Sequence, residues 1–589
     1  MAQITPSRNL SEPPADAAIP RALSGVIDRV MQHPSLTPKK KGEIVSAIRR
    51  FSRAFDKDPA QIPAQPQVIG RQRRMIVPAE IGMTPASWSN TVSLVRKGLE
   101  VTGCYVRPEK YYPPMSATWA EPAGNIANKK LMYALNRFFH FADEQGWHPR
   151  DITDAHIDRY RDYLETKTIT PDPAELCRLT CQNWNRACRE TPDWPGKPVT
   201  VPARPRVRAS FWVKWSDVPE TLHAQLQKFL ASRAEFDVLK EGAAKPCSPR
   251  TIKDDEENLR AFISALDQRG RKASTLPDLP ALLEPNTLRD GLRFFLDRKE
   301  GKTSAYTFSI ANTLVALARH LRAQTPPFID EARLEDVEAL RKKLAYKQKG
   351  VTTKNKALLR LFTDPRNVAK LLFLPSRLLE GVSLKGRPTV YDALRVRWAL
   401  AIEILLVFPI REKNLVTLHL KNNIVRTGTH KNAKVLIVIP ADDVKNGFEL
   451  EVDLPQETID LLDLYLERYR PLLVRDGGDW LFPGETGGHM HPRGFGEQLK
   501  RVIHRETGLP VNVHFFRHFS AKLWLDHNPG QFEVMQYALG HKSTKTLLKF
   551  YAEFSSIKAL ALYDGHLLKL REELAHLATP ARCKSRRRR

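Results

Sequence analysis

In this chain of 589 residues, one stretch carries the clearest β-sheet signal and thereby limits the fold. Residues 435–455, VLIVIPADDVKNGFELEVDLP, contain two β-rich runs around a polar turn that includes Gly447. Such a pair of runs predicts a β-hairpin. The other strongly patterned segments carry apolar residues at helical spacing. The sequence therefore predicts a mainly α-helical protein with one small antiparallel β-sheet, an α+β fold.

Apolar periodicity predicts helices through most of the chain. Two of them lie within 125–166, where Gly146 marks the turn between them and Thr153 caps the second helix. Residues 1–33 are rich in Pro, Ala and Ser, and we expect them to be disordered. The other helices are predicted at 38–55, 83–103, 248–270, 284–301, 304–324, 391–410 and 455–473, with further helices up to about residue 577.

The chain is too long for a single hydrophobic core, so we expect several domains. Residues 191–210 carry five prolines and several basic residues without an apolar period, which is typical of a linker. The helices after this linker partly repeat the pattern of 128–165, either through duplication or because amphipathic helices resemble one another. The predicted parts are a helical N-terminal region (34–190), a second helical domain (211–350), a domain that contains the sheet (366–579) and a basic tail (580–589).

The formal net charge of the chain is +27. A chain this basic is expected to bind a polyanion, because Lys and Arg release condensed counterions when they neutralise phosphates. Nucleic acid and a membrane surface are the two candidate polyanions. The sequence has no apolar run of about 18 residues, so no transmembrane helix is predicted. Its start, MAQITPSRNLSEPPADAA, lacks the basic and then apolar pattern of a signal peptide, and we expect a cytoplasmic protein without membrane attachment.

Three cysteines lie close together in CRLTCQNWNRAC, at Cys177, Cys181 and Cys188. On a helix they would lie near one stripe, which allows a zinc site or half-buried thiols. No second Cys-x-x-Cys or His-x-x-x-His follows, so we favour the thiol interpretation and expect no metal ion. Six cysteines in a chain of this length also do not make a disulfide framework.

Chemically active residue types gather near the C-terminus, in VHFFRHFSAKLWLDHNPGQFEVMQYALGHKSTKTLLKFYAEF (513–554). His514 and Arg517 are three residues apart on a predicted helix start, so they share a face. His541 follows a Leu-Gly pair, and Tyr551 comes ten residues later. Taken singly, the first two also fit an ordinary polar helix face, and His541 fits a helix cap. Core packing does not require the whole set.

These residue types suit the cleavage of a DNA phosphodiester without metal or water. Tyrosine is a nucleophile whose phenolate is also a fair leaving group, so the covalent step is reversible. Arginines can hold two phosphate oxygens at once and stabilise the charge that develops on the non-bridging oxygens. Lysine and histidine can supply the acid that protonates the departing 5′ oxygen.

The stretch resembles the catalytic domain of the tyrosine recombinase, or phage integrase, family, which carries Arg…Lys…His-x-x-Arg…His/Trp…Tyr in that order. The resemblance covers roughly 366–577, with a weaker match to the family's helical core-binding domain over about 216–350. FPIREKNL supplies the first arginine at the end of an apolar helix, and the predicted hairpin supplies the lysine. The catalytic residues that the resemblance implies are Arg411, Lys445, His514, Arg517, His541 and Tyr551.

The family pattern assigns the nucleophile to Tyr551. Many members place this tyrosine nine residues after the second histidine, which would fall on Phe550, a residue without a hydroxyl. Tyr537 lies before that histidine and Tyr563 lies beyond the motif, so we expect both to be packing residues.

Other positions need the same weighing. Asn414 stands where relatives often carry an acidic residue, and its amide can still hydrogen-bond the residues around the site. His518 has two interpretations, a packing residue or a phosphate contact. Lys431 and Lys434 lie near Lys445, but they precede the first predicted strand rather than occupy the turn.

Members of this family hold double-stranded DNA in a C-shaped clamp between the helical and catalytic domains. The resemblance implies that Tyr551 forms a 3′-phosphotyrosyl bond and frees a 5′-hydroxyl, so that neither ATP nor any cofactor is needed. It also implies four protomers on paired DNA sites, linked through a C-terminal segment. Residues 556–578 are a candidate for that contact, or a helix packed on its own domain.

The predicted function is therefore site-specific DNA recombination by an integrase of a mobile element. A hairpin telomere resolvase or a type I topoisomerase-like enzyme would use a similar residue set, and a non-catalytic DNA-binding protein is a further alternative. The N-terminal region, 34–190, exceeds what a minimal integrase needs. It could be a second DNA-binding module or a partner-binding domain.

Overall fold

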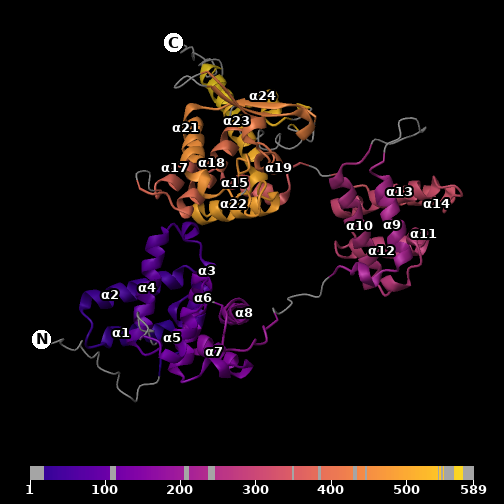
Figure 1. Cartoon of the computed structure of the whole chain (residues 1–589). Helices are drawn as coiled ribbons and strands as arrows, with labels where there is room; N and C mark the ends of the chain where they lie inside the picture. Colours follow the sequence, from indigo (N-terminus) through magenta and orange to yellow (C-terminus); the bar gives the residue numbers. More distant parts are fainter. Residues whose placement is uncertain are drawn as a thin grey trace, which may run out of the picture. The chain divides into compact units, whose positions relative to one another are not determined.

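The computed structural model of the chain (Figure 1) divides into two compact units, Met1–Arg204 with Thr353–Arg589, and Pro205–Thr352. Among the described residues, no helix combines the length and the apolar character that a membrane crossing requires. The limits and roles of the predicted domains stay predictions. The structure describes residues 19–105, 114–170, 172–203, 211–235, 246–347, 350–382, 386–428, 434–444, 447–475, 477–540, 543–544, 548 and 563–574.

Residues 19–105 form a first helical core. Its helices are α1 (Leu23–Gln32), α2 (Pro38–Arg53), α3 (Pro66–Met75) and α4 (Pro85–Val101), with 3₁₀ turns at Pro59–Gln61 and Pro78–Ile81. Thr37 caps the N-terminus of α2, and its Oγ1 accepts a hydrogen bond from the N–H of Lys40 (3.3 Å). Gly98 allows α4 to approach α2 closely, because a Cβ there would lie 2.9 Å from the Ile44 side chain.

The prediction of disorder over 1–33 is wrong for its last part, where α1 forms. Leu23, Val26 and Val30 are buried on one face of this helix. Their spacing is that of an amphipathic helix, but the Pro, Ala and Ser around them dominate the local composition. Residues 1–18 lie outside the described residues.

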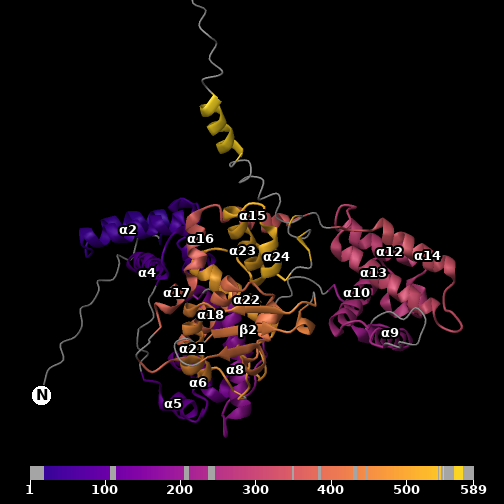
Figure 2. The same ribbon diagram turned by 90° about the horizontal axis from the view of Figure 1, so that it is seen from above.

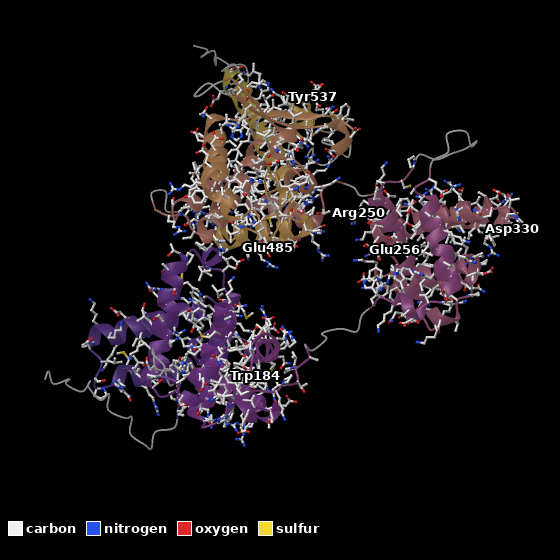
Figure 3. All side chains as sticks on the ribbon, viewed as in Figure 1. Trp184, Arg250, Glu256, Asp330, Glu485 and Tyr537 are labelled. Atoms are coloured by element: carbon white, nitrogen blue, oxygen red, sulfur yellow. The ribbon has the colours of Figure 1, made fainter. Side chains whose placement is uncertain are left out.

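A second helical core occupies residues 114–203. Its helices are α5 (Ala117–Gly124), α6 (Lys129–Glu144), α7 (Asp154–Lys167) and α8 (Pro173–Glu190), with a 3₁₀ turn at Pro149–Asp151. Trp184, labelled in Figure 3, and Trp119 lie in its centre with their rings 6.3 Å apart. Cys177 and Cys181 are buried in the same core. Within the described part of the chain, no three metal-ligating side chains are grouped.

Part of the predicted linker, 191–210, packs on this second core. Val199 is buried, and its backbone exchanges two hydrogen bonds with the Asn185 side chain (2.7 and 2.8 Å). Trp184 Nε1 donates to the carbonyl oxygen of Lys197 (2.8 Å). Prolines remove the helical period but leave an extended backbone whose carbonyls can still accept hydrogen bonds. Residues 204–210 lie outside the described residues.

Residues 211–347 form a helical domain with its own core. Its helices are α9 (Glu220–Ser232), α10 (Pro249–Gln268), α11 (Leu279–Leu282), α12 (Pro285–Asp297), α13 (Ala305–Arg322) and α14 (Glu331–Lys343), with 3₁₀ turns at Trp215–Asp217 and Ala273–Thr275. Ser248 caps the N-terminus of α10, and its Oγ accepts a hydrogen bond from the N–H of Thr251 (3.2 Å). It is followed by Gly270 in the left-handed region (φ 92°).

Residues 350–540 combine helices with one three-stranded antiparallel sheet of order β1-β2-β3 (Figure 2). The strands are β1 (Ile424–Thr427), β2 (Lys434–Ile439) and β3 (Leu450–Asp453). The helices are α15 (Thr353–Leu361), α16 (Pro365–Leu372), α17 (Leu374–Leu379), α18 (Val390–Val407), α19 (Glu412–Val416), α20 (Leu420–Asn423), α21 (Gln456–Leu464), α22 (Pro492–Thr507), α23 (Val513–His527) and α24 (Phe532–Ala538). A π-helical turn, Tyr465–Tyr469, and a 3₁₀ turn, Arg470–Leu472, follow α21.

The predicted fold class is confirmed: the described chain is mainly helical, with one small antiparallel sheet. β2 and β3 form the predicted hairpin, with Ile439 opposite Leu450. β1 is a strand that the periodicity does not predict. It is four residues long at the sheet edge, and three of its four residues are exposed, so it lacks the alternation of a half-buried strand.

Candidate active site

Arg411 stands in the turn that follows α18. This helix is buried along most of its length and ends at Val407, shortly before Pro409, which has no N–H to continue a helix. Arg411 precedes α19 with an extended backbone (φ −74°, ψ 150°). Its Nη1 is buried without a hydrogen-bond partner in the described structure, and burial lowers the pKa of its guanidinium. A buried cationic donor without a partner is a favourable place for an anion.

Arg517 is held inside the protein, where it is 4% exposed on α23. Its Nη1 donates to the carbonyl oxygen of Pro409 (2.8 Å), and its Nη2 donates to the carbonyl oxygen of Leu539 (2.6 Å). The first bond joins α23 to the turn before Arg411, and the second joins α23 to the end of α24. Together they fix the plane of the guanidinium and connect three separate segments.

His514 lies on the first turn of α23, one turn before Arg517. This helix begins at Asn512, whose Oδ1 accepts a hydrogen bond from the N–H of Phe515 (2.9 Å). The pKa of His514 is lowered by desolvation and, to a smaller extent, by the positive charges of Arg517 and Arg411. His514 and Arg517 share α23, and Arg517 bonds Pro409, two residues before Arg411, so the three residues lie near one another. The ring is uncharged at neutral pH and can accept a hydrogen bond or a proton.

His518 faces a neighbouring helix. Its ring centroid lies 5.2 Å from that of His514, and its Nε2 lies 3.2 Å from Nδ2 of Asn355 on α15. This contact agrees with a packing role for His518.

Asn414 links the Arg411 segment to the β-hairpin. It is 4% exposed on α19, and its Nδ2 donates to the carbonyl oxygen of Asp443 (3.0 Å). Asp443 ends the 3₁₀ turn Ala441–Asp443, two residues before Lys445. In the sequence, Asn414 stands out as a departure from the family pattern. Because Asn414 is three residues after Arg411, the sequence could have indicated that its side chain supports the segment around Arg411.

Three of the predicted site residues, Lys445, His541 and Tyr551, lie outside the described residues. The other three, Arg411, His514 and Arg517, are brought together by the contacts above. Their grouping leaves a positively charged site with one neutral base, which suits the binding of a phosphate group.

The segment that leads to His541 is described up to Gly540. This glycine has φ 58°, a left-handed conformation that L-residues rarely adopt. A Cβ at this position would also lie 2.6 Å from Leu450 Cδ2 in β3. The Leu-Gly pair before the second histidine thus needs glycine for its backbone and for the space beside the hairpin.

The prediction that Tyr537 and Tyr563 are packing residues is wrong. Tyr537, labelled in Figure 3, is 79% exposed on α24, and Tyr563 is 59% exposed. α24 is seven residues long and buries only Met535, so most of its side chains face solvent. Tyr563 lies in the described helical stretch 563–574, whose side chains are mostly exposed.

No family model matches the chain, and no curated protein matches it. Among solved structures it is similar to a XerH site-specific recombinase bound to difH substrate, with 19% identity and a TM-score of 0.33 over 52% of this chain and 78% of that chain. It is also similar to a Tn1549 transposon integrase in complex with transposon right end DNA, with 14% identity and a TM-score of 0.31 over 60% of this chain and 100% of that chain. A XerA recombinase is similar with 15% identity and a TM-score of 0.22 over 58% of this chain and 98% of that chain. These structural neighbours are recombinases and integrases, similar at low identity.

Proposed function

We propose that the protein is a tyrosine recombinase of a mobile element that cuts and rejoins DNA at specific sites through a 3′-phosphotyrosyl intermediate. The observation that carries the proposal is that Arg517, on the same helix as His514, bonds the carbonyl oxygen of Pro409 in the turn that holds Arg411, so that two guanidinium groups and one imidazole are grouped. These residues also stand in the sequence order that the family resemblance requires, with Lys445, His541 and Tyr551 at the remaining positions.

In this mechanism, Tyr551 Oη attacks the phosphorus of the scissile phosphodiester, and the P–O5′ bond breaks. Arg411 and Arg517 stabilise the negative charge on the non-bridging oxygens. His514 is neutral and accepts the phenolic proton or a hydrogen bond at the phosphate, and Lys445 protonates the departing 5′ oxygen. A 5′-hydroxyl of a partner strand then attacks the phosphotyrosine and releases Tyr551. The energy of the phosphodiester is retained, so the reaction needs no ATP.

We further propose double-stranded DNA as the substrate and a homotetramer on paired sites as the working assembly. The net charge of +27 supports a polyanionic partner. In the helical stretch 563–574, Tyr563, Leu568 and Leu574 are 59%, 57% and 50% exposed. Exposed apolar side chains on one helix support a contact between protomers rather than packing on its own domain. A cytoplasmic location stays a prediction from the sequence.

Trapping of the covalent intermediate tests this function. The purified full-length protein is incubated with duplexes from the DNA that flanks its gene. Each duplex is nicked just beyond the cleavage point, so that the short fragment with the free 5′-hydroxyl dissociates and cannot be rejoined. The reaction is then denatured with detergent. The expected product is protein linked to a 3′ phosphate, together with a free 5′-hydroxyl. Plasmids that carry two sites should also give joint molecules.

The alternative functions give different products in the same assay. Relaxed plasmid without site-dependent joint molecules indicates a topoisomerase-like enzyme, and closed hairpin ends indicate a telomere resolvase. DNA binding without any covalent product contradicts every tyrosine-nucleophile function and leaves a non-catalytic DNA-binding protein.

A further inference from the structure

Four arginines line a cavity in the N-terminal part of the chain, which Figure 1 shows in indigo to purple. The cavity has a volume of about 550 Å³. Arg73 and Arg74 come from α3, Arg96 comes from α4, and Arg137 comes from α6. Residues 168–170, which follow α7, form a further wall. We call this cavity, defined by its four arginines, the arginine cavity.

The arginine cavity lies where the two helical cores of residues 19–203 meet. Ile169, just after α7, packs among apolar residues of the first core. Gly70 on α3 lies directly against it, because a Cβ there would be 2.8 Å from the Ile169 carbonyl oxygen. Thr168 is held as well, since its Oγ1 donates to the carbonyl oxygen of Leu164 (2.7 Å). Packed backbone therefore builds the walls of the cavity.

No carboxylate in the described structure pairs with the four arginines. Asp172 and Glu175 also line the cavity, but both already have partners. Asp172 Oδ1 accepts a hydrogen bond from the N–H of Glu175 (3.0 Å), and both carboxylate oxygens of Glu175 accept from Arg178 (2.7 Å each). Arg137 Nη1 donates to the neutral hydroxyl of Thr170 (3.2 Å). Asp172 keeps its charge because its partner is a neutral N–H, but one free carboxylate offsets the four arginines only in part, so the cavity stays positively charged.

Two of the four arginines, Arg73 and Arg96, are half-buried, whereas Arg74 and Arg137 are exposed. Arg96 Nε is buried and has no hydrogen-bond partner among the described residues. Desolvation lowers the pKa of Arg73, and the charges of Arg96 and Arg74 lower it further. Like charges held together in a partly dry site oppose folding. Such an arrangement is expected where a ligand supplies the opposite charge.

We propose that the arginine cavity is a phosphate-binding site and that its phosphates belong to the DNA backbone. A guanidinium group can form two hydrogen bonds with phosphate oxygens, and the Thr170 hydroxyl can donate as well. One inorganic phosphate carries at most two charges at neutral pH, fewer than the four arginines, whereas a DNA strand presents successive phosphates. The choice of DNA rests on the proposed function, but the phosphate site rests on the cavity itself.

A charge-matched pair of variants of the full-length protein tests the site. Arg73→Gln/Arg96→Gln removes two charges from the cavity. Lys129→Gln/Lys130→Gln removes two charges from exposed positions on α6 that do not line it. Affinity for a 40-base-pair duplex of mixed sequence is measured as a function of KCl concentration.

The expected slope of log affinity against log salt becomes smaller by about 2 for the arginine variant, since each lost phosphate contact removes about 0.9. Its affinity at 0.1 M salt falls roughly 10- to 100-fold, and the lysine variant stays near wild type. Equal losses in the two variants, or no loss in the arginine variant, overturn DNA binding at this cavity.

Thermal unfolding separates the sources of phosphate. Without ligand, the arginine variant should be at least as stable as wild type, because repulsion is relieved. ATP and inorganic phosphate are then added separately to both proteins. If ATP raises the wild-type midpoint but not that of the variant, and the salt slopes agree, the phosphate site stands with a nucleotide as its ligand. If no probe distinguishes the two proteins, the site is overturned.

Trapping through Tyr551 is scored independently of these measurements. Covalent product, with neither a slope difference nor a ligand-dependent shift of the midpoint between wild type and the arginine variant, overturns the arginine cavity and leaves the recombinase function standing. A slope difference without covalent product supports the arginine cavity and contradicts the recombinase function.

Discussion

The side chains of the proposed centre differ in how the protein holds them. Arg517 is bonded to two backbone carbonyls, whereas Arg411 keeps a buried Nη1 without a partner in the described structure. His514 experiences both charges and is neutral at pH 7. Substitution of each residue should therefore affect stability and activity in different proportions.

Arg411→Ala and Arg517→Ala should separate transition-state stabilisation from folding. Each is expected to slow covalent complex formation roughly 10²- to 10³-fold, by analogy with the loss of a single oxyanion donor. Arg517→Ala also leaves two buried carbonyls without their donor, so it should lower the free energy of unfolding by about 2–4 kcal/mol. Single-turnover rates and thermal unfolding measure the two effects. An equal loss of stability in both variants would contradict the structural difference.

Tyr551→Phe should abolish the covalent product and leave DNA affinity close to wild type, because it removes one oxygen and keeps the ring. Tyr537→Phe is the matched control, since it removes the same atom from an exposed phenol on α24. It should retain the product. The suicide-substrate gel measures both variants. A protein-linked band with Tyr551→Phe would place the nucleophile elsewhere, and a missing band with Tyr537→Phe would point to that residue.

His514 should make stability depend on pH below about 7. Its folded-state pKa lies below the usual value of about 6.5, so the unfolded chain takes up the proton more readily. Stability is therefore complete above about 6.5 and is lost as the pH falls toward the lowered pKa. The thermal midpoint of wild type should fall relative to that of His514→Gln over this window. A difference between the two midpoints that does not vary with pH would contradict the shift.

At the scale of elements, α23 carries the most contacts of the proposed centre. It presents His514 and Arg517, and through Arg517 it joins the turn after α18 to the end of α24. On the same helix, Lys522 and Asp526 form an ion pair at 2.5 Å with side chains 7% and 19% exposed. The pair follows Arg517 along α23 and belongs to the helix rather than to the candidate site.

Asp526→Ala should destabilise the protein by about 3 kcal/mol, because it leaves the buried Lys522 ammonium without its partner. The double variant Lys522→Met/Asp526→Leu removes both charges and should recover most of that loss. Chemical denaturation followed by tryptophan fluorescence measures the difference, with Trp524 on the same helix as a local probe. A double variant that is less stable than the single one would show that the pair stabilises the fold.

At the scale of the whole molecule, the charge of +27 predicts a steep salt dependence of DNA binding. A protein that makes six to ten phosphate contacts loses roughly 10³- to 10⁵-fold in affinity between 50 and 200 mM salt. Fluorescence anisotropy with a labelled duplex at several KCl concentrations measures this slope. A flat response would mean that the basic residues do not contact phosphates, and would remove the main support for a polyanionic partner.

Local spacing determined much of the architecture. Within the described residues, the helices predicted between 38 and 473 and the β2–β3 hairpin form where apolar periodicity places them, because a period of 3.6 or 2 is a property of neighbouring residues. Other elements, among them α1, α3, α9, α14 and β1, lie outside the segments that periodicity predicted. α1 carries its period in a Pro- and Ala-rich context, and β1 is an exposed edge strand that depends on pairing with β2.

The candidate site shows the same division. The resemblance of the residue order to a family pattern predicted Arg411, His514 and Arg517 as site residues. Their grouping, the bond from Asn414 to the hairpin turn, and the exposure of Tyr537 were decided only by the tertiary structure. The arginine cavity has no signature in sequence, since its walls come from helices far apart in the chain. Such residues meet only when the cores of two helical groups pack together.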